Sequence, residues 1–290
     1  MTRCNIILSC FGLAISITSA ASPYLIGSSI NLYLSQDSSY IFTISTACLL
    51  IITAPILRLA ANIYLQQISS KTRSILKKKL LKLLLISNFS NSRKSGEIID
   101  MIDGDVDSAL YLYHAVFLDV TINSSLIVLS LLIISYYFPF MIFAPLSGIA
   151  FALLFYFITQ KQSDTIYTQY VTENTTLIGT ICDLLTLSKT PPYTEILRSD
   201  IDKISKLALH SSFKASMFEA LSGLCYLLAM GILFLTALYA INSKIMNTGA
   251  IFAAAIYIER VLAPTTSLIS IYYSTREASY RRRRILSLEQ

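Results

Sequence analysis

Four ionisable residues lie inside long apolar stretches of this sequence, and their side chains are the ones best suited to act on a solute. They are Arg58, Asp119, Glu259 and Arg260. A charge inside a bilayer is costly, so such a residue pairs with another group, reaches the membrane surface or lines a polar pathway. Adjacent residues point in different directions on a helix. Glu259 and Arg260 therefore have two interpretations: a polar patch on a translocation cavity, or charges that pair with other helices.

Arg58 and Asp119 lie towards one end of their apolar stretches. The long side chain of Arg58 can reach the membrane surface, and this interpretation is preferred over contact with a transported substrate. Asp119 is interpreted in the same way. All four residues are candidates for a substrate pathway.

The other reactive side chains do not form a pattern typical of a catalytic or metal centre. The two histidines, His114 and His210, are far apart, and none of the five cysteines belongs to a CxxC pair. We expect the cysteines to be small buried apolar residues, with no metal site and no disulfide framework. No GxxxxGK[ST] phosphate-binding pattern occurs, so no catalytic residue is assigned. The cysteines are Cys4, Cys10, Cys48, Cys182 and Cys225.

The composition is that of a membrane protein. Hydrophobic residues make up 54% of the chain and charged residues only 14%, with a mean hydropathy of +0.61, whereas soluble proteins carry roughly 25% charged residues. Helices are expected because lipid offers no partners to open backbone groups. The predicted fold class is an all-α membrane protein with six transmembrane helices. These cover about residues 5–32, 40–64, 115–136, 139–158, 217–240 and 248–270.

The first of these segments also has the features of a cleaved signal peptide, with Arg3 before an apolar run and small residues after it. Its apolar character resumes at Tyr24, which gives the length of about 20 residues that a span needs. A retained first span is therefore the preferred interpretation, and cleavage is the alternative.

Basic residues assign the connections between spans to the two sides of the membrane. The long connections, about residues 65–114 and 159–216, and the segment after the last span hold nearly all of them, whereas the short turns hold only Lys244. Because lysine and arginine collect in cytoplasmic segments, both long connections and both chain ends are predicted to be cytoplasmic. The net charge of +6 then indicates contact with anionic headgroups of the lipid bilayer. No nucleic-acid partner is predicted.

Each long connection is predicted to be a helical hairpin. No glycine or proline occurs from Lys71 to Leu85, and apolar residues recur there at helical spacing. The second span is therefore expected to continue unbroken to about Ile86. Turn-forming residues mark the two hairpin tips, at Ser87 to Lys94 and at Ser188 to Tyr193.

A new helix is expected after the first tip, beginning at Gly96-Glu97. Asp100, Asp103 and Asp107 then share one face of it by their spacing. We interpret this face as a solvated surface opposite the lysines of the same hairpin.

This arrangement resembles the transmembrane domain of ATP-binding-cassette (ABC) exporters over essentially the whole chain. Ser95-Gly96-Glu97-Ile98-Ile99 with Asp105-Val106 is similar to the SGEI…DV pattern that follows the first tip in that family. Leu177 to Ile181 resembles the stretch before the second tip, and Thr248-Gly249-Ala250 the start of the sixth span. The segment from Ala278 to Glu289 resembles the ending that leads into the ATPase domain.

Two details refine the resemblance. The run Arg260-Val261-Leu262-Ala263-Pro264 is similar to that of the protein and peptide exporters of type I secretion systems. Met101 stands where the family has an arginine, and no nucleotide-binding domain is recognised in the 290 residues. ATP hydrolysis is therefore expected on another chain or on a further part of the protein.

The resemblance implies partners and coupling residues. Two such domains pair in this family, and the hairpin tips dock on nucleotide-binding domains, fused or separate, that hold ATP and Mg²⁺. No cofactor is expected on this chain itself. The resemblance assigns coupling to Phe89, Ser90, Arg93, Gly96 and Glu97 in the first hairpin, and to Thr190, Pro191 and Tyr193 in the second.

Together with the resemblance, these patterns predict the transmembrane domain of an exporter in a bacterial inner (plasma) membrane. The expected substrate is a peptide, a protein or a lipophilic molecule. The alternative is an ATPase-free membrane scaffold or degenerate permease that binds a partner without pumping.

Overall fold

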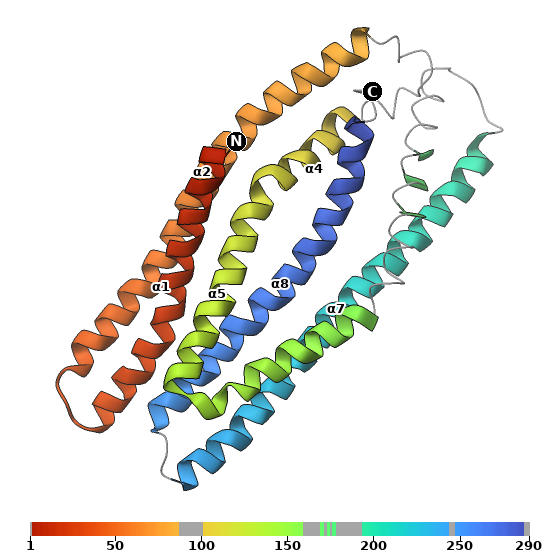
Figure 1. Cartoon of the computed structure of the whole chain (residues 1–290). Helices are drawn as coiled ribbons and strands as arrows, with labels where there is room; N and C mark the ends of the chain where they lie inside the picture. Colours follow the sequence, from red (N-terminus) through yellow and green to blue (C-terminus); the bar gives the residue numbers. More distant parts are fainter. Residues whose placement is uncertain are drawn as a thin grey trace. The chain divides into compact units, whose positions relative to one another are not determined.

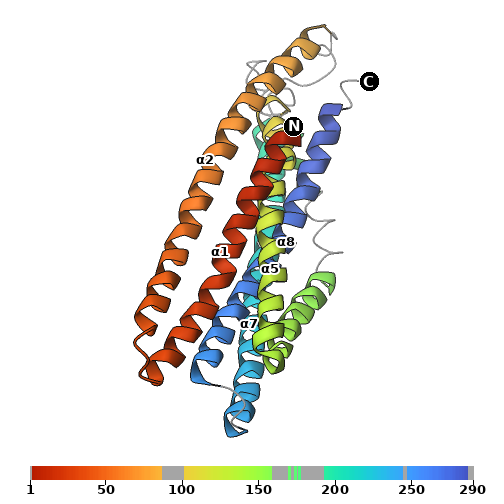
Figure 2. The same ribbon diagram turned by 60° about the vertical axis from the view of Figure 1, so that its left-hand side comes forward.

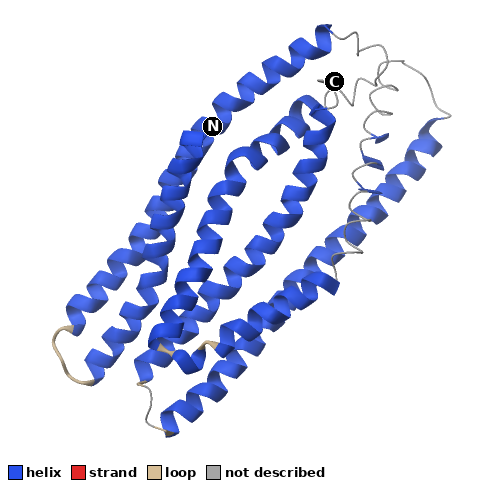
Figure 3. Ribbon diagram, in the orientation of Figure 1, coloured by secondary structure: helices blue, strands red, loops and turns tan. Residues whose placement is uncertain are grey.

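Helices form every regular element in the part of the chain that the structure describes (Figure 3). The computed structural model describes residues 2–86, 101–158, 193–243 and 247–286, and short helical pieces at 169–170, 173–174 and 176–177. A helix without a label covers residues 143–158. In chain order the named elements are α1 (Thr2–Leu34), α2 (Tyr40–Ile86), the π-helix η2 (Met101–Asp105), α4 (Val106–Leu110), the π-helix η3 (Tyr111–Ala115), α5 (Val116–Tyr137), the 3₁₀-helix η4 (Pro139–Met141), α7 (Tyr193–Asn242) and α8 (Thr248–Leu286). Figure 1 labels the α-helices among them.

Among the described residues, six segments are long and apolar enough to cross a membrane. Their number and order agree with the prediction from sequence, so the chain is an all-helical protein with the character of a membrane protein. The second segment extends as a helix beyond the predicted end of the span, through residues rich in lysine. The six segments are Cys4–Leu34, Tyr40–Lys82, Val116–Tyr137, Pro139–Ile158, Ala220–Asn242 and Thr248–Thr275.

Two of these helices are much longer than a bilayer requires. α2 is unbroken over 47 residues, which confirms the predicted continuation to Ile86. α7 has 50 residues, of which only Ala220–Asn242 form the apolar segment. The part of the second long connection from Ile196 to Lys214 lies within α7 and is helical, as expected for that connection. The tip residues before Tyr193, and those that follow Ile86, lie outside the described residues.

The chain divides into two compact units. The first, here called the bundle unit, comprises Met1–Ile68, His114–Leu154 and Leu221–Tyr273. The second, here called the extension unit, comprises Ser69–Tyr113, Phe155–Ala220 and Ser274–Gln290.

The bundle unit has two apolar cores. The larger joins α5, the helix at 143–158, α7 and α8, with Tyr257 and Ile258 of α8 fully buried at its centre. The smaller lies between α1, α2 and α5 and is built on Leu8, Ala61 and Leu118. In two views α1 and α2 run side by side as an antiparallel pair (Figure 2).

Short turns join α1 to α2 and α5 to the next helix, as the sequence predicts. In the first turn Gln36 has a φ of 59°, a left-handed conformation that a short turn permits. The Asp37 carboxylate accepts hydrogen bonds from the hydroxyl and the backbone N–H of Ser39, the latter at 2.9 Å. These bonds lower the pKa of Asp37 because they favour its charged form.

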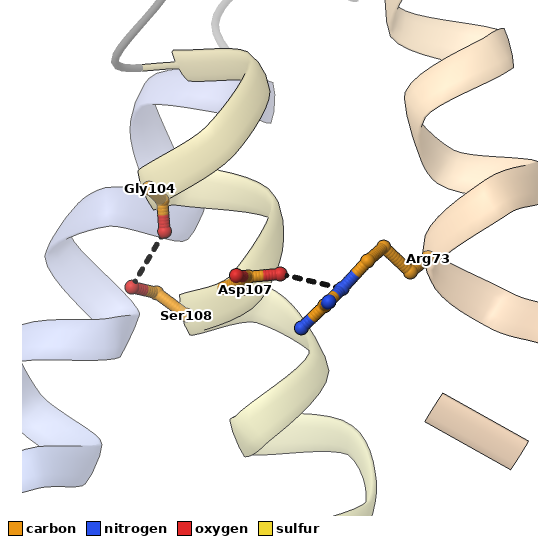
Figure 4. Close-up of polar contacts among 4 residues, drawn as sticks. All are labelled: Arg73, Gly104, Asp107 and Ser108. Carbon is orange, nitrogen blue, oxygen red and sulfur yellow. Dashed lines mark hydrogen bonds and ion pairs between the residues drawn. The ribbon is translucent and has the colours of Figure 1, made fainter. Parts of the chain in front are cut away.

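The extension unit has a small core of its own. Leu80 of α2 and Val106 and Leu110 of α4 are buried together. Beside them Arg73 Nε donates to Asp107 Oδ1 at 2.8 Å, with both side chains about half exposed (Figure 4). The predicted position of Asp107 opposite the basic face of the first hairpin is therefore correct.

The backbone of this segment differs from the plain helix expected, because the π-helices η2 and η3 flank the five residues of α4. Asp105, which is not part of the predicted acidic face, is fully buried. Val106 and Leu110, which lie between the two π-helices, face the core.

Candidate membrane pathway along helix α8

The two charged residues of α8 lie at the surface of the bundle unit. Glu259 is exposed and Arg260 is half-buried. Neither side chain has an ion-pair or hydrogen-bond partner among the described residues. Among the described residues, no neighbouring helix therefore holds either charge, and both interpretations of the sequence stay predictions.

Glu259 belongs to one exposed face of α8. Phe252, Glu259, Ala263 and Ser270 are exposed, and their spacings of seven, four and seven residues place them on one line along a helix. This set is called the α8 face below. From Phe252 at its start to Ser270 at its end, the face carries the charge of Glu259 and the small side chain of Ala263. The sequence analysis selected Glu259 but did not recognise the face, although the spacing of these four residues is visible in the sequence.

The exposed faces of α2 and α7 differ from the α8 face. Ile52 and Leu59 of α2 are 59% and 61% exposed, and Leu227 and Leu235 of α7 are 65% and 70% exposed. Large apolar side chains are suited to lipid, whereas a bare carboxylate in the middle of a span is not. The α8 face therefore has the composition of a surface that meets water or another polar group.

The opposite side of α8 is packed firmly, and this fixes the direction of the α8 face. Tyr257 is fully buried, and its hydroxyl donates to the carbonyl oxygen of Ala20 in α1 at 2.6 Å. Val261 and Leu262 are buried one turn further along. Because Tyr257 points into the bundle, Glu259 is directed away from it.

Helices α1 and α8 meet closely near the start of α8. The backbone N–H of Gly249 donates to Asn31 Oδ1 at 2.9 Å. A Cβ atom on Gly249 would overlap the carbonyl oxygen of Gly27, so only glycine fits there. Gly249 was singled out from sequence as part of a family pattern, and its close packing is the physical reason for the residue at this position.

Polar side chains also join α5 to its neighbours. Asn123 Nδ2 donates to Ser267 Oγ of α8 at 3.2 Å. Ser16 of α1 donates to the carbonyl oxygen of Ile122 at 2.9 Å, and Ser125 donates to Ser16 at 2.7 Å. Small polar residues let apolar helices approach and bond to one another. The sequence offered no reason to choose these particular residues.

The remaining two charged candidates lie on α2 and α5. Arg58 is exposed on α2, and Asp119 is half-buried on α5. The smaller core brings these two helices together. That Arg58 and Asp119 reach the membrane surface stays a prediction.

His114 is a buried polar residue that sequence reasoning did not assign. It is only 1% exposed, and its Nδ1 lies 3.2 Å from Asn5 Oδ1 of α1. That contact requires a proton on Nδ1, and Nε2 has no hydrogen-bond partner among the described residues. Burial lowers the pKa of His114 because it disfavours the charged imidazolium.

The predicted coupling residues fall mostly outside the described part of the chain. Tyr193 is the first residue of α7, and only its backbone is described. The others lie outside the described residues: Phe89, Ser90, Arg93, Gly96, Glu97, Thr190 and Pro191.

The expectation for the cysteines is wrong at two positions. Cys10 and Cys48 are exposed and Cys4 is half-buried, whereas Cys225 is buried as expected. Both exposed thiols lie on apolar helices. They are therefore surrounded by other apolar side chains of the helix surface and not by a packed core. No cluster of three metal-ligating side chains occurs in the residues that the structure describes.

Comparison with known protein families finds no family that matches this chain, and no curated protein matches its sequence.

Proposed function

We propose that this chain is the transmembrane domain of an ATP-driven exporter of the ABC type. Two copies form a translocation pathway across a bacterial inner membrane, for a peptide, a protein or a lipophilic substrate. Nucleotide-binding domains, on another chain or on a further part of the same protein, hold ATP and Mg²⁺ and drive the pathway through the two hairpin tips.

The observation that carries this proposal is the length of α2 and α7. At 1.5 Å per residue, helices of 47 and 50 residues rise about 70 and 75 Å, whereas the hydrocarbon core is about 30 Å thick. Residues 193–219 of α7 lie outside the apolar segment that begins at Ala220. A helix that continues far beyond the membrane suits a protein that transmits movement between the bilayer and a soluble domain.

The α8 face supports the location of the pathway. It combines Glu259 with small and polar residues on a helix that is otherwise the least apolar of the six candidate spans. Charged residues within spans typically mark substrate pathways. In this proposal α2 and α7 face lipid and α8 faces the pathway. Glu259 and Arg260 are the residues we assign to the pathway.

A photo-cross-linking experiment tests the predicted coupling. The photoreactive residue p-benzoylphenylalanine replaces Phe89 or Tyr193, the protein is irradiated in native membranes, and cross-linked peptides are sequenced by mass spectrometry. We expect a peptide from a domain that contains a GxxxxGK[ST] motif. The matched control replaces Phe42, which is 78% exposed on α2, and should yield no such peptide.

Two outcomes would defeat the proposal. One is the absence of any ATPase peptide from both tip positions. The other is labelling of cysteines at these positions by a membrane-impermeant maleimide added outside the cell. If an ATPase is found, Phe89→Ala with Tyr193→Ala should leave ATP hydrolysis in proteoliposomes intact while transport is lost, because the domains would no longer transmit closure to the spans.

A further inference from the structure

The α8 face holds a carboxylate that nothing in the described chain neutralises. Glu259 is exposed, and the cation beside it, Arg260, is half-buried at the edge of the same face. Adjacent residues on a helix are about 100° apart and do not face each other. Because lipid cannot satisfy either charge, we look for a polar partner beyond the described residues of this chain.

The charges themselves indicate what that partner is. The helix rises about 1.5 Å per residue, so Glu259 and Arg260 lie at almost the same depth in the membrane. A two-fold axis along the membrane normal keeps depth unchanged, and in a two-fold interface residue i meets residue j while j meets i. A second copy of this chain therefore offers an arginine opposite Glu259 and a glutamate opposite Arg260.

The shape of the α8 face fits a second helix. Ala263 lies one turn beyond Glu259 on the same line, and its exposed side chain is small. Small residues at an exposed position let two helix backbones approach closely in a membrane. The large exposed residue of this face, Phe252, lies about two turns before Glu259, clear of the point where the charges would meet.

We propose that the α8 face docks on the α8 face of a second copy, with Glu259 of each copy paired to Arg260 of the partner subunit. This inference rests on the proposed function, in which two copies enclose the pathway, and it describes the closed state of that pathway. Two reciprocal ion pairs across the axis neutralise all four charges and hold the two α8 helices together.

Charge-swap variants test the docking. Two differently tagged copies are co-expressed, and their association is measured by co-purification from lipid nanodiscs without ATP and without any ATPase. Glu259→Arg places two cations on each copy, and Arg260→Glu places two anions. Each variant should associate with itself at least about tenfold more weakly than the natural chain, because like charges oppose each other at the axis.

The decisive sample mixes the two variants. A Glu259→Arg copy and an Arg260→Glu copy complement each other, so the mixed pair should associate as the natural chain does. The double variant Glu259→Arg/Arg260→Glu should also recover self-association. The matched control is Lys203→Glu, which breaks an exposed ion pair with Glu173 inside one chain and should leave association unchanged.

The results that overturn the docking are equally specific. If either single variant associates with itself like the natural chain, or if the mixed pair fails to recover, the ion pairs do not exist. If the single variants keep associating and Glu259→Gln instead loses binding of tetraphenylphosphonium, the α8 face takes an organic cation and the docking is wrong.

Cysteine cross-linking covers the case in which a charge swap prevents membrane insertion. In a variant without the five native cysteines, Ala263→Cys should form a disulfide between two copies, and Leu235→Cys on the exposed apolar face of α7 should not. An absence of cross-linking at position 263 overturns the proposal. Loss of transport with cross-linking retained would instead defeat the exporter function alone.

Discussion

His114 makes the stability of the bundle unit depend on pH. Burial lowers its pKa below that of the unfolded chain, so the folded protein binds a proton less readily than the unfolded protein does. Its contribution to stability is complete above the unfolded value of about 6.5 and is lost as pH falls from there through the folded value. The thermal unfolding temperature in detergent should therefore be lower at pH 5.5 than at pH 7.5.

The histidine variants separate this effect from other titrations. His114→Gln should unfold with a smaller change between the two pH values. His210→Gln changes an exposed histidine of the extension unit and should keep the full change. An equal pH dependence in both variants would show that His114 is not the group responsible.

Gly249 is the residue at which added volume should be most harmful. A Cβ atom there would overlap Gly27 of α1 and press on Asn31, and overpacking of this kind costs about 1–3 kcal/mol. We expect Gly249→Ala to lower the unfolding temperature in lipid nanodiscs. The control is Gly231→Ala on α7, where a Cβ meets nothing within 4 Å.

The two glycine variants should move in opposite directions. Alanine favours a helix by about 1 kcal/mol over glycine, so Gly231→Ala should leave stability unchanged or raise it. Equal destabilisation by both substitutions would contradict the close approach of α1 and α8.

At the scale of elements, the extension unit should depend on apolar packing more than on its ion pair. Leu80 is 3% exposed in the small core with α4, and Leu80→Ala should cost about 2–5 kcal/mol of local stability. Asp107→Asn removes the contact with Arg73, in which both side chains are half exposed, and should cost under about 1 kcal/mol. Amide hydrogen exchange of Val106–Leu110 measures both. If Asp107→Asn lowered local stability more than Leu80→Ala, the ion pair and not the apolar core would dominate the stability of this unit.

The long α-helices could be predicted from the sequence, and the π-helices could not. The unbroken run to Ile86 follows from the absence of glycine and proline and from helical apolar spacing, which are local properties. The π-helices η2 and η3 flank the residues that pack on Leu80, and that packing joins residues distant in sequence.

The candidate site was predictable only in part, for the same reason. Glu259 and Arg260 are visible in the sequence because a charge interrupts an apolar run. Their exposure depends on which side of α8 packs inward, and that is decided by Tyr257 and its bond to Ala20. Arg58 and Asp119 were found singly, because sequence spacing does not reveal that α2 and α5 share a core.

At the scale of the whole molecule, the distribution of basic residues predicts which segments face the cytoplasm. In a variant without native cysteines, Ser38→Cys in the turn between α1 and α2 should react with an impermeant maleimide outside intact cells. Leu209→Cys, at a position 73% exposed on α7, should react only after permeabilisation. The reverse labelling pattern would mean that the orientation is wrong.

The glycine contact between α1 and α8 has a mechanical consequence. Because the two backbones touch at Gly27 and Gly249 and Asn31 holds the α8 backbone there, this point is a natural fulcrum. Tyr273 lies 24 residues further along, about 36 Å away. A rigid tilt of α8 by about 5° around the fulcrum moves that end by about 3 Å and Glu259 by only about 1 Å. A small rotation at one end of α8 would thus be magnified at the other.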